Sequence, residues 1–261
     1  MKWGRRAQRH PEVVVSEEEG VRYLHLGGDH IQSAMRIGAP DDLELDYTRT
    51  MMAFLLFHPR PRDCLMVGLG GGSIPKFIYR RLPGVRTRVV ELNPAVITAA
   101  RSLFKVPGES GRLRIELGDG AKAVHAMQAG CDLLFVDGFD DGAQVPALVS
   151  DEFYAAAYRA LRESGVLVVN FFGHDRRFDR YLKRIEAAFS GSVICLDARE
   201  DGNVIVFALK GAPESITWEE LRRCAARLEE KLGLPFERCV PGLRKMNRWT
   251  RAALLISAGM D

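Results

Sequence analysis

Short apolar segments alternate with amphipathic segments through the middle of the chain. Strand-like apolar segments lie at 64–68, 86–92, 112–117, 132–137 and 165–172, and helical patterns lie between and after them at 73–82, 94–104, 119–128, 150–163 and 175–189. Strands that alternate with helices of roughly 10–15 residues form βαβ units, whose parallel sheet is covered on both faces. The pattern therefore predicts a doubly wound α/β domain.

Two further apolar segments, Val193–Leu196 and Val204–Leu209, end this region. Only the polar turn Asp197–Asn203 separates them, and a connection this short leaves no room for a crossover helix. The two segments must therefore pair antiparallel. A mostly parallel, seven-stranded sheet that ends in an antiparallel hairpin resembles the Rossmann-like fold of class I transferases that use S-adenosylmethionine (AdoMet), rather than that of NAD dehydrogenases.

The residues before this region predict a small β-meander and a helix. Strand patterns lie at Glu12–Val15, Val21–Leu26 and His30–Ile37. Residues Tyr47–His58 predict an amphipathic or buried helix, which Pro59 stops. A few strands alone are marginally stable, so the meander is a candidate for a dimer interface.

The pattern changes again after Lys210. Thr217 and Glu220 have the spacing of a capping box, which predicts a charged helix from there to about Leu232. A further helix is predicted from Trp249 to Ala258. We therefore expect three parts, which are an N-terminal β-meander at 1–46, a Rossmann-like domain at 47–210 and a helical C-terminal extension at 211–261.

Charge and composition narrow the class of protein. A net charge of +3 is small for 37 basic and 34 acidic residues, so neither nucleic acid nor a membrane surface is an expected partner. No run approaches the ~18 apolar residues of a membrane span, and the basic N-terminus lacks the apolar region of a signal peptide. The five cysteines form no CxxC pair and the six histidines have no metal-ligand spacing. These observations predict a cytoplasmic protein with no metal site.

The stretch from Cys64 to Glu91 has the pattern of a nucleotide-binding βαβ unit. An apolar segment leads into a turn that contains Gly68, Gly70, Gly71 and Gly72, and the next apolar segment ends in Glu91. Glycines let the backbone approach a ligand closely. An acid about 20 residues beyond them accepts hydrogen bonds from ribose hydroxyls. The pattern indicates a nucleoside ligand but not its identity.

Acidic residues also follow the third and fourth predicted strands. Asp119 stands in LGDGA, where it could also cap the next helix, and Asp137, Asp140 and Asp141 stand in DGFDD. Carboxylates bind ammonium groups by charge-assisted hydrogen bonds, and one placed at a reacting amine can accept its proton. The acidic fourth strand end therefore favours a cationic substrate, with Asp137 as the ligand-binding residue and Asp141 as a turn residue.

Together these positions resemble the polyamine aminopropyltransferases, which are spermidine synthase and its relatives. The family has a Gln in an N-terminal β segment, a helix that begins with Tyr, a GGGDGG turn, an acid after the second strand, a GDG or GDA, and a DSSDP. The corresponding positions, in the same order, are Gln32 in HIQSAM, Tyr47 in DYTRTM, GLGGGS at 68–73, Glu91 in VVELN, Asp119 in LGDGA, and Asp137 and Asp140 in DGFDD. The resemblance extends from about Val21 to Phe207.

The resemblance implies transfer of an aminopropyl group from decarboxylated AdoMet to an amine such as putrescine. It also implies 5′-methylthioadenosine as the product and suggests a homodimer, and no prosthetic group is expected. Glu91 would bind the ribose, Asp119 would border the adenine, and Asp137 would accept the attacking amine. The implied site comprises Asp137, Asp140 and Tyr47 for the amine and, for the nucleoside, Gln32, Gly68, Gly70, Gly71, Gly72, Glu91, Asp119 and Gly120.

Several positions depart from the family pattern. Gly71 stands where the family has the Asp that holds the donor's amine, Arg49 replaces a Glu, and Asn170 replaces a Gln. Arg49 near the amine pocket would oppose a polycation, and backbone N–H groups at Gly71 would suit the carboxylate of intact AdoMet. Two alternatives therefore stay open, an AdoMet-dependent methyltransferase on the same fold and a non-catalytic homologue that binds a nucleoside or a polyamine.

Overall fold

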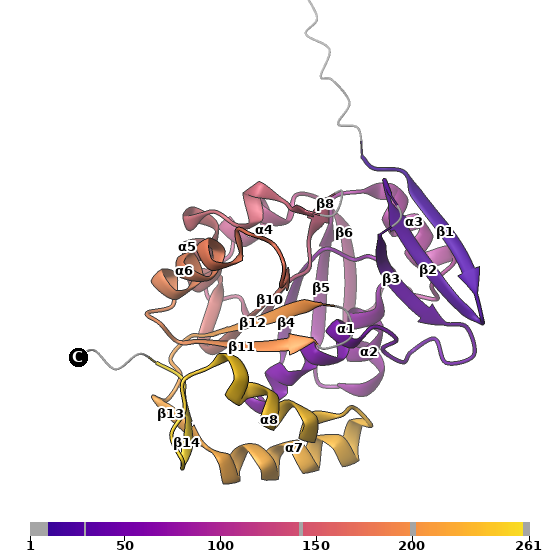
Figure 1. Ribbon diagram of the computed structural model, residues 1–261. Coiled ribbons are helices and arrows are strands. Elements are labelled where there is room, and N and C mark those ends of the chain that lie inside the picture. Colours follow the sequence, from indigo (N-terminus) through magenta and orange to yellow (C-terminus); the bar gives the residue numbers. More distant parts are fainter. Residues whose placement is uncertain (1–9, 29, 141–142, 199–201, 258–261) are drawn as a thin grey trace, which may run out of the picture.

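A seven-stranded sheet forms the centre of the molecule (Figure 1). The computed structural model describes residues 10–28, 30–140, 143–198 and 202–257. The strand order is β11-β12-β10-β7-β4-β5-β6, and the strands are β4 (Asp63–Val67), β5 (Arg86–Glu91), β6 (Leu113–Leu117), β7 (Cys131–Val136), β10 (Leu161–Phe172), β11 (Val193–Ala198) and β12 (Asn203–Leu209). All neighbours pair parallel except β12, which is antiparallel to both β10 and β11. The predicted doubly wound sheet with an antiparallel end is confirmed.

Helices cover both faces of this sheet. On one face pack α1 (Asp46–Met51), the 3₁₀ turn η1 (Met52–Leu56), α2 (Ser73–Arg81) and α3 (Pro94–Ser102), and on the other pack α4 (Gly120–His125), α5 (Asp151–Ala160) and α6 (Phe178–Ala188). Successive strand residues point to alternate faces. The neighbours Met66 and Val67 therefore belong to two different apolar clusters, one on each face of the sheet. Burial on both faces explains the nearly continuous apolar runs in the sequence.

Several helices end earlier than the sequence predicts, among them those expected at 94–104 and 119–128, which end at Ser102 and His125. The helix expected at 47–58 ends at Met51 and continues as η1 to Leu56. The helix expected at 150–163 ends at Ala160, because Leu161 already pairs with Cys131 of β7. A short antiparallel pair, β8 (Phe139–Asp140) and β9 (Ala143–Gln144), and the 3₁₀ turn η2 (Pro146–Leu148) were not predicted. Elements of two or three residues are too short to show a periodicity.

The N-terminal meander is a separate antiparallel sheet, as predicted. Its strands β1 (Val13–Glu18), β2 (Val21–Leu26) and β3 (Ile31–Arg36) lie in the order β1-β2-β3. One face packs on α3 and the segment after it, through Leu24 and Met35 against Ala99 and Phe104. The helix α3 therefore lies between the two sheets (Figure 1), and this packing brings β3 beside the glycine turn after β4.

The C-terminal extension contains two helices and a small hairpin. These are α7 (Trp218–Leu232), α8 (Phe236–Met246), β13 (Ser215–Thr217) and β14 (Ala253–Leu255). The predicted capping box of α7 is confirmed, and Gly233 ends that helix with φ of 70°. The helix expected at Trp249–Ala258 is wrong, because β14 pairs with β13, and Ala258 lies outside the described residues. No helix in the described part of the chain has the length and apolarity that a membrane span requires.

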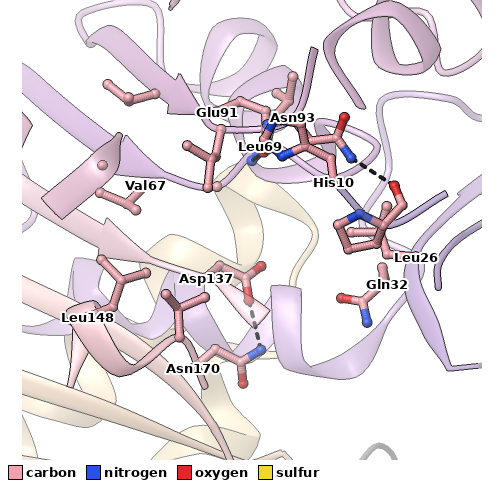
Figure 2. A pocket seen from close by; sticks show the side chains of 18 of the residues that line it. His10, Leu26, Gln32, Val67, Leu69, Glu91, Asn93, Asp137, Leu148 and Asn170 are labelled. Carbon is pink, nitrogen blue, oxygen red and sulfur yellow. Dashed lines mark hydrogen bonds between the residues drawn. The ribbon is translucent and has the colours of Figure 1, made fainter. Parts of the chain in front are cut away.

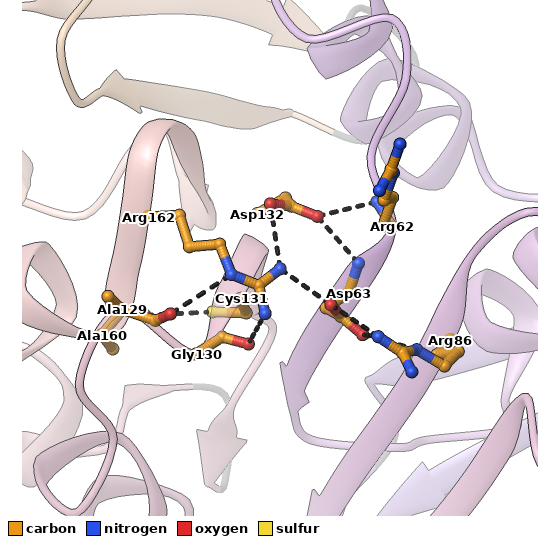
Figure 3. A network of polar contacts seen from close by, with 9 residues as sticks. All are labelled: Arg62, Asp63, Arg86, Ala129, Gly130, Cys131, Asp132, Ala160 and Arg162. Carbon is orange, nitrogen blue, oxygen red and sulfur yellow. Dashed lines mark hydrogen bonds and ion pairs between the residues drawn. The ribbon is translucent and has the colours of Figure 1, made fainter.

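A network of ion pairs joins four strands at the sheet edge where the parallel strands begin (Figure 3). The Arg162 guanidinium donates to Asp63 Oδ2 at 2.7 Å and to Asp132 Oδ1 at 3.2 Å, and also to the carbonyl oxygens of Ala129 and Gly130. Arg86, at the start of β5, donates to both oxygens of Asp63. These contacts connect β4, β5, β7 and β10 where β10 begins irregularly.

Replacing Arg162 with glutamine should lower the stability of the fold. Four hydrogen bonds would be weakened or lost, and partial exposure limits the cost to about 1–2 kcal/mol. For a chain of this size, that cost lowers Tm by roughly 2–8 °C. Thermal unfolding followed by circular dichroism measures it. The exposed Arg159 on α5 offers a matched control, and equal melting temperatures for Arg159→Gln and Arg162→Gln would show that the network contributes nothing.

Candidate functional site

A cavity of about 470 Å³ lies at the opposite edge of the sheet, where the parallel strands end (Figure 2). This volume is in the range of ligand-binding pockets, roughly 300–1,000 Å³. The ends of β4, β5 and β10, the loops after β6 and β7, and the start of β12 contribute to its lining, together with residues of β2, β3, α1, α4 and η2. The residues predicted from the sequence that line it are Gln32, Tyr47, Gly68, Gly70, Glu91, Asp119, Gly120 and Asp137. The structure thus brings together most of the side chains that were selected from the sequence.

The glycine turn forms one wall of the cavity. Gly68 has φ of +92°, and a Cβ at this position would overlap the backbone carbonyl of Asp137. Only glycine therefore lets the ends of β4 and β7 approach this closely. Gly70 also lines the cavity, with φ of +54°. Gly71 and Gly72 are buried and face Phe104 and Val106, so these two predicted residues are not among the lining residues.

Glu91 is the last residue of β5 and holds two loops in place. Its Oε2 accepts a hydrogen bond from the backbone N–H of Leu69, and its Oε1 accepts one from that of Asn93, both at 2.8 Å. Burial raises the pKa of this carboxyl, and the backbone N–H groups of Asn93, Leu69 and Leu92 act against that rise. A carboxylate has about four lone-pair sites. Glu91 can therefore accept a further hydrogen bond from a hydroxyl group in the cavity.

Asn93 was not selected from the sequence, although its place before Pro94 is a recognisable helix start. Its Oδ1 accepts from the N–H of Ala95 and caps α3. Its Nδ2 donates to the carbonyl oxygen of Pro11 at 3.1 Å. The side chain therefore attaches the N-terminal segment, with His10 and Pro11, to the rim of the cavity.

Asp119 both caps a helix and lines the cavity. Its Oδ1 accepts from the N–H of Lys122 at 3.2 Å, as the N-cap of α4. Gly120 begins that helix directly against β4, because a Cβ there would overlap Val67. The helix-capping interpretation and the ligand-site interpretation of Asp119 are therefore compatible in one geometry.

Asp137 follows β7 and is held by two side chains. The Nδ2 of Asn170 donates to its Oδ1 at 2.9 Å, and the Tyr47 hydroxyl lies 3.4 Å from its Oδ2 and 3.3 Å from the carbonyl oxygen of Gln32. Burial raises the pKa of the Asp137 carboxyl to about 6, and the hydrogen bonds from Asn170 and Tyr47 act against that rise. The result is a carboxylate that is ionised near neutral pH and lies at a cavity wall. Such a group can hold an ammonium ion or accept its proton.

Asn203, at the start of β12, extends this set of hydrogen bonds. Its Nδ2 donates to the Oδ1 of Asn170 at 2.7 Å. Both asparagines are buried, and both line the cavity. Nothing in the sequence pattern indicates Asn203, because it ends a polar hairpin turn of the kind in which asparagine is common.

The position of Arg49 differs from the sequence-based expectation. Its Nε donates to the carbonyl oxygen of Leu43 at 2.7 Å, and its guanidinium also donates to that of Glu44. It lines a second, smaller cavity between α1, β11 and α8, together with Asp46 and Arg238. Arg49 does not line the cavity that holds Asp137 and does not oppose a cation there.

Two predicted acidic residues stay untested. Asp140 lies in β8, but its side chain is outside the description, and Asp141 lies outside the described residues altogether. Among the side chains that are described, no group of three or more His, Cys, Asp or Glu could hold a metal ion.

Comparisons with known proteins agree on the kind of fold and family. The model of the spermine/spermidine synthase domain matches residues 44–193. The polyamine aminopropyltransferase of Chromobacterium violaceum is 42% identical over 246 residues, which cover 94% of each chain.

Two solved structures have the same fold. The probable spermidine synthase from Corynebacterium glutamicum has a TM-score of 0.69 at 19% identity, over 88% of this chain and 91% of that one. Human methyltransferase-like protein 13, in complex with SAH, has a TM-score of 0.64 at 23% identity, over 79% of this chain and 96% of that one. A probable spermidine synthase and a methyltransferase-like protein thus share this architecture.

Proposed function

Because the chain belongs to the spermine/spermidine synthase family, we propose that it transfers the aminopropyl group of decarboxylated AdoMet to a small amine such as putrescine, releasing 5′-methylthioadenosine. The observation that carries the proposal is the Asp137 carboxylate. It lies in one cavity with the glycine turn, Glu91 and Asp119. On this proposal the nucleoside would bind next to a carboxylate that receives the amine, as this reaction requires.

The nucleoside end is suited to adenosine through its own residues. The free lone pairs of Glu91 would accept the ribose hydroxyls, and Asp119 would border the adenine. The Gln32 side chain points into the cavity (Figure 2), where it would lie near the sulfur. These assignments extend the observed geometry to a bound donor.

The chemical step would be a displacement at the carbon next to a sulfonium sulfur. The amine nitrogen forms a C–N bond to that carbon while the C–S bond breaks, and the bonding pair goes to sulfur, which leaves as a neutral thioether. The nitrogen needs a free lone pair to attack and loses one proton overall. Asp137 would hold the amine and accept that proton, while Tyr47 orients the carboxylate and Asp140 contributes to binding the polyamine. Positioning an unprotonated amine supplies most of the rate.

A methyl transfer from intact AdoMet is the second candidate, and Gly71 favours it. The acid that would hold the donor's amine is absent there, and a Cβ would lie 2.7 Å from Phe104 and 2.8 Å from Ser33 Oγ. Position 71 therefore has no space for a carboxylate side chain, and decarboxylated AdoMet loses one charged contact.

An assay of products separates these functions. The purified protein is incubated with decarboxylated AdoMet or AdoMet and with putrescine or spermidine, and nucleoside products are separated by chromatography. We expect amine-dependent 5′-methylthioadenosine from decarboxylated AdoMet. Formation of S-adenosylhomocysteine from AdoMet would contradict aminopropyl transfer and support methyl transfer. Binding of 5′-methylthioadenosine in calorimetry without any transfer would indicate a non-catalytic homologue.

Transfer should fall as the pH decreases through about 6. Burial raises the pKa of Asp137 from 3.8 to about 6, and the neutral acid below that pH cannot bind an ammonium ion. The fold binds this proton more tightly than the unfolded chain does, so the group's contribution to stability increases as the pH falls from 6 to 4. Protonation of Asp137 therefore does not unfold the protein between pH 6 and pH 4, so unfolding from this cause cannot account for a loss of activity there.

A profile of kcat from pH 5 to 8 measures this effect, with a melting curve at each pH as the control. A flat profile in this range would contradict the assigned role of Asp137.

We also propose a cytoplasmic homodimer that associates through the N-terminal sheet. Val14 and Ile31 are apolar residues of this sheet that are each 49% exposed. Both stand opposite His25, so they lie in one row across the three strands. Sedimentation velocity tests the assembly, since a species of 29.1 kDa would be a monomer. Fractionation of cells that express the protein tests its location.

A further inference from the structure

We propose that Asn203 is a positioning residue, which orients the Asn170 amide so that its N–H faces Asp137 and thereby keeps that carboxyl group ionised. The inference deepens the proposed function and rests on it, because it matters for catalysis only if Asp137 receives the amine. Asn203 itself acts through Asn170.

The sheet register places the two asparagines side by side. On the antiparallel pair β10–β12, Asn170 is opposite Ile205 and Phe172 is opposite Asn203. Asn170 and Asn203 are therefore diagonal neighbours on one face of the sheet. Both are nearly inaccessible, at 2% and 4% exposure, so the 2.7 Å hydrogen bond between them is protected from water.

The direction of the hydrogen bonds carries the inference. A side-chain amide has one donor end and one acceptor end, whereas an ionised carboxylate only accepts. The Asn203 N–H donates to the Asn170 carbonyl, and the Asn170 N–H donates to Asp137 Oδ1. Both amides thus point their donors toward Asp137, and each hydrogen bond polarises the next. If Asn170 turned over, its carbonyl would face Asp137, and only the protonated acid could then pair with it.

Among the side chains that the structure describes, no other group around Asp137 replaces this arrangement. The Tyr47 hydroxyl of α1 faces the other carboxylate oxygen. The remaining titratable residues that line the cavity are His10, His30, Glu91 and Asp119. The Asn170 hydrogen bond is the largest effect that lowers the pKa of Asp137 against the rise due to burial. Turning the Asn170 amide over would remove this hydrogen bond, and the pKa of Asp137 would rise.

The test is Asn203→Asp, a nearly isosteric change. A carboxylate at 203 can only accept, so it would bind the Asn170 N–H and turn the Asn170 carbonyl toward Asp137. Its negative charge would further disfavour ionisation of Asp137. The titration midpoint of Asp137 is measured by NMR of protein labelled with carbon-13 at the aspartate carboxyls, and Asp137→Asn assigns the signal. We expect the midpoint to rise by about one pH unit or more.

In steady-state kinetics, the apparent pKa of the acid limb of the kcat–pH profile should rise by the same amount. At pH 6, a midpoint raised from about 6 to about 7 lowers the ionised fraction of Asp137 by roughly fivefold. Asn203→Asp should therefore lose about fivefold in kcat at this pH, while its affinity for 5′-methylthioadenosine changes less than about threefold. Asn203→Ala removes the donor without adding a charge, and we expect a smaller rise of the midpoint. This second variant keeps the test valid if Asn203→Asp does not fold.

Thr87→Val serves as the matched control. Thr87 is a buried polar residue on β5, next to the end that lies away from the cavity, so its replacement should leave the midpoint unchanged. A midpoint that is equal in wild type and in both folded Asn203 variants would overturn the inference. The NMR readout needs no turnover. A wild-type protein that transfers nothing would therefore overturn the proposed function, while the midpoints would still decide the role of Asn203.

Discussion

Replacing Asp137 with asparagine is expected to lower kcat for aminopropyl transfer by roughly 10²–10⁴-fold. The affinity for 5′-methylthioadenosine should change less than about threefold, because Glu91 and Asp119 at the nucleoside end are untouched. The amide cannot accept a proton from the amine and carries no charge to bind an ammonium ion. It is similar in size to the carboxylate and can still contact Tyr47 and Asn170, so the fold should be kept. Single-turnover kinetics and calorimetry with 5′-methylthioadenosine measure the two effects.

Asp179→Asn is the control for this experiment. Asp179 lies exposed in the first turn of α6, so the same chemical change occurs far from the cavity and should leave kcat unaltered. If Asp137→Asn retained wild-type kcat, another group would have to accept the amine. Asp140, whose side chain is not described, would then be the first candidate.

Restoring the family's acid by Gly71→Asp is expected to impair the protein. The new Cβ would lie 2.7 Å from the ring of Phe104 and 2.8 Å from Ser33 Oγ, and both of these side chains are buried. Overpacking of this kind costs about 1–3 kcal/mol, and burying an unpaired carboxylate adds to the cost. We therefore expect a Tm lower by several degrees and weaker binding of decarboxylated AdoMet.

Thermal unfolding and calorimetry test this expectation, with Gly84→Asp as the control. A Cβ at Gly84 meets no atom within 4 Å, so an aspartate there should be tolerated. If Gly71→Asp were as stable as wild type and bound decarboxylated AdoMet more tightly, the donor's amine would lie beside position 71. The packing argument would then be wrong.

The sequence predicted the fold and much of the cavity because both depend on strand ends. Glu91, Asp119 and Asp137 each follow an apolar segment, and parallel strands place their carboxyl ends at one edge. The error at Arg49 has a geometric cause. Tyr47 and Arg49 are two residues apart on α1, and positions two apart on an α-helix point about 200° from each other. A tyrosine that reaches Asp137 therefore places Arg49 on the other side of the helix.

The remaining features depend on contacts between segments far apart in the chain. The space at Gly71 is filled by Phe104 and Ser33, which come from different elements. The link from Asn203 to Asn170 depends on the register of an antiparallel pair, and a periodicity of two does not specify which residues stand opposite each other. The hairpin of β13 and β14 pairs residues that are far apart in the chain, Ser215 with Leu255 and Thr217 with Ala253, so no local sequence pattern predicts it.

Strand β7 has an aspartate near each end, and the two have opposite environments. Asp132 is neutralised by Arg162 and by two backbone N–H groups, whereas Asp137 meets only neutral donors among its described partners. The charge at one end of the strand is thus compensated within the protein, and the charge at the other end lies at the cavity where we propose that the amine binds. Substitutions for heat resistance can therefore be chosen at the Asp132 end, one strand length from the proposed substrate site, and we expect them to leave turnover unchanged.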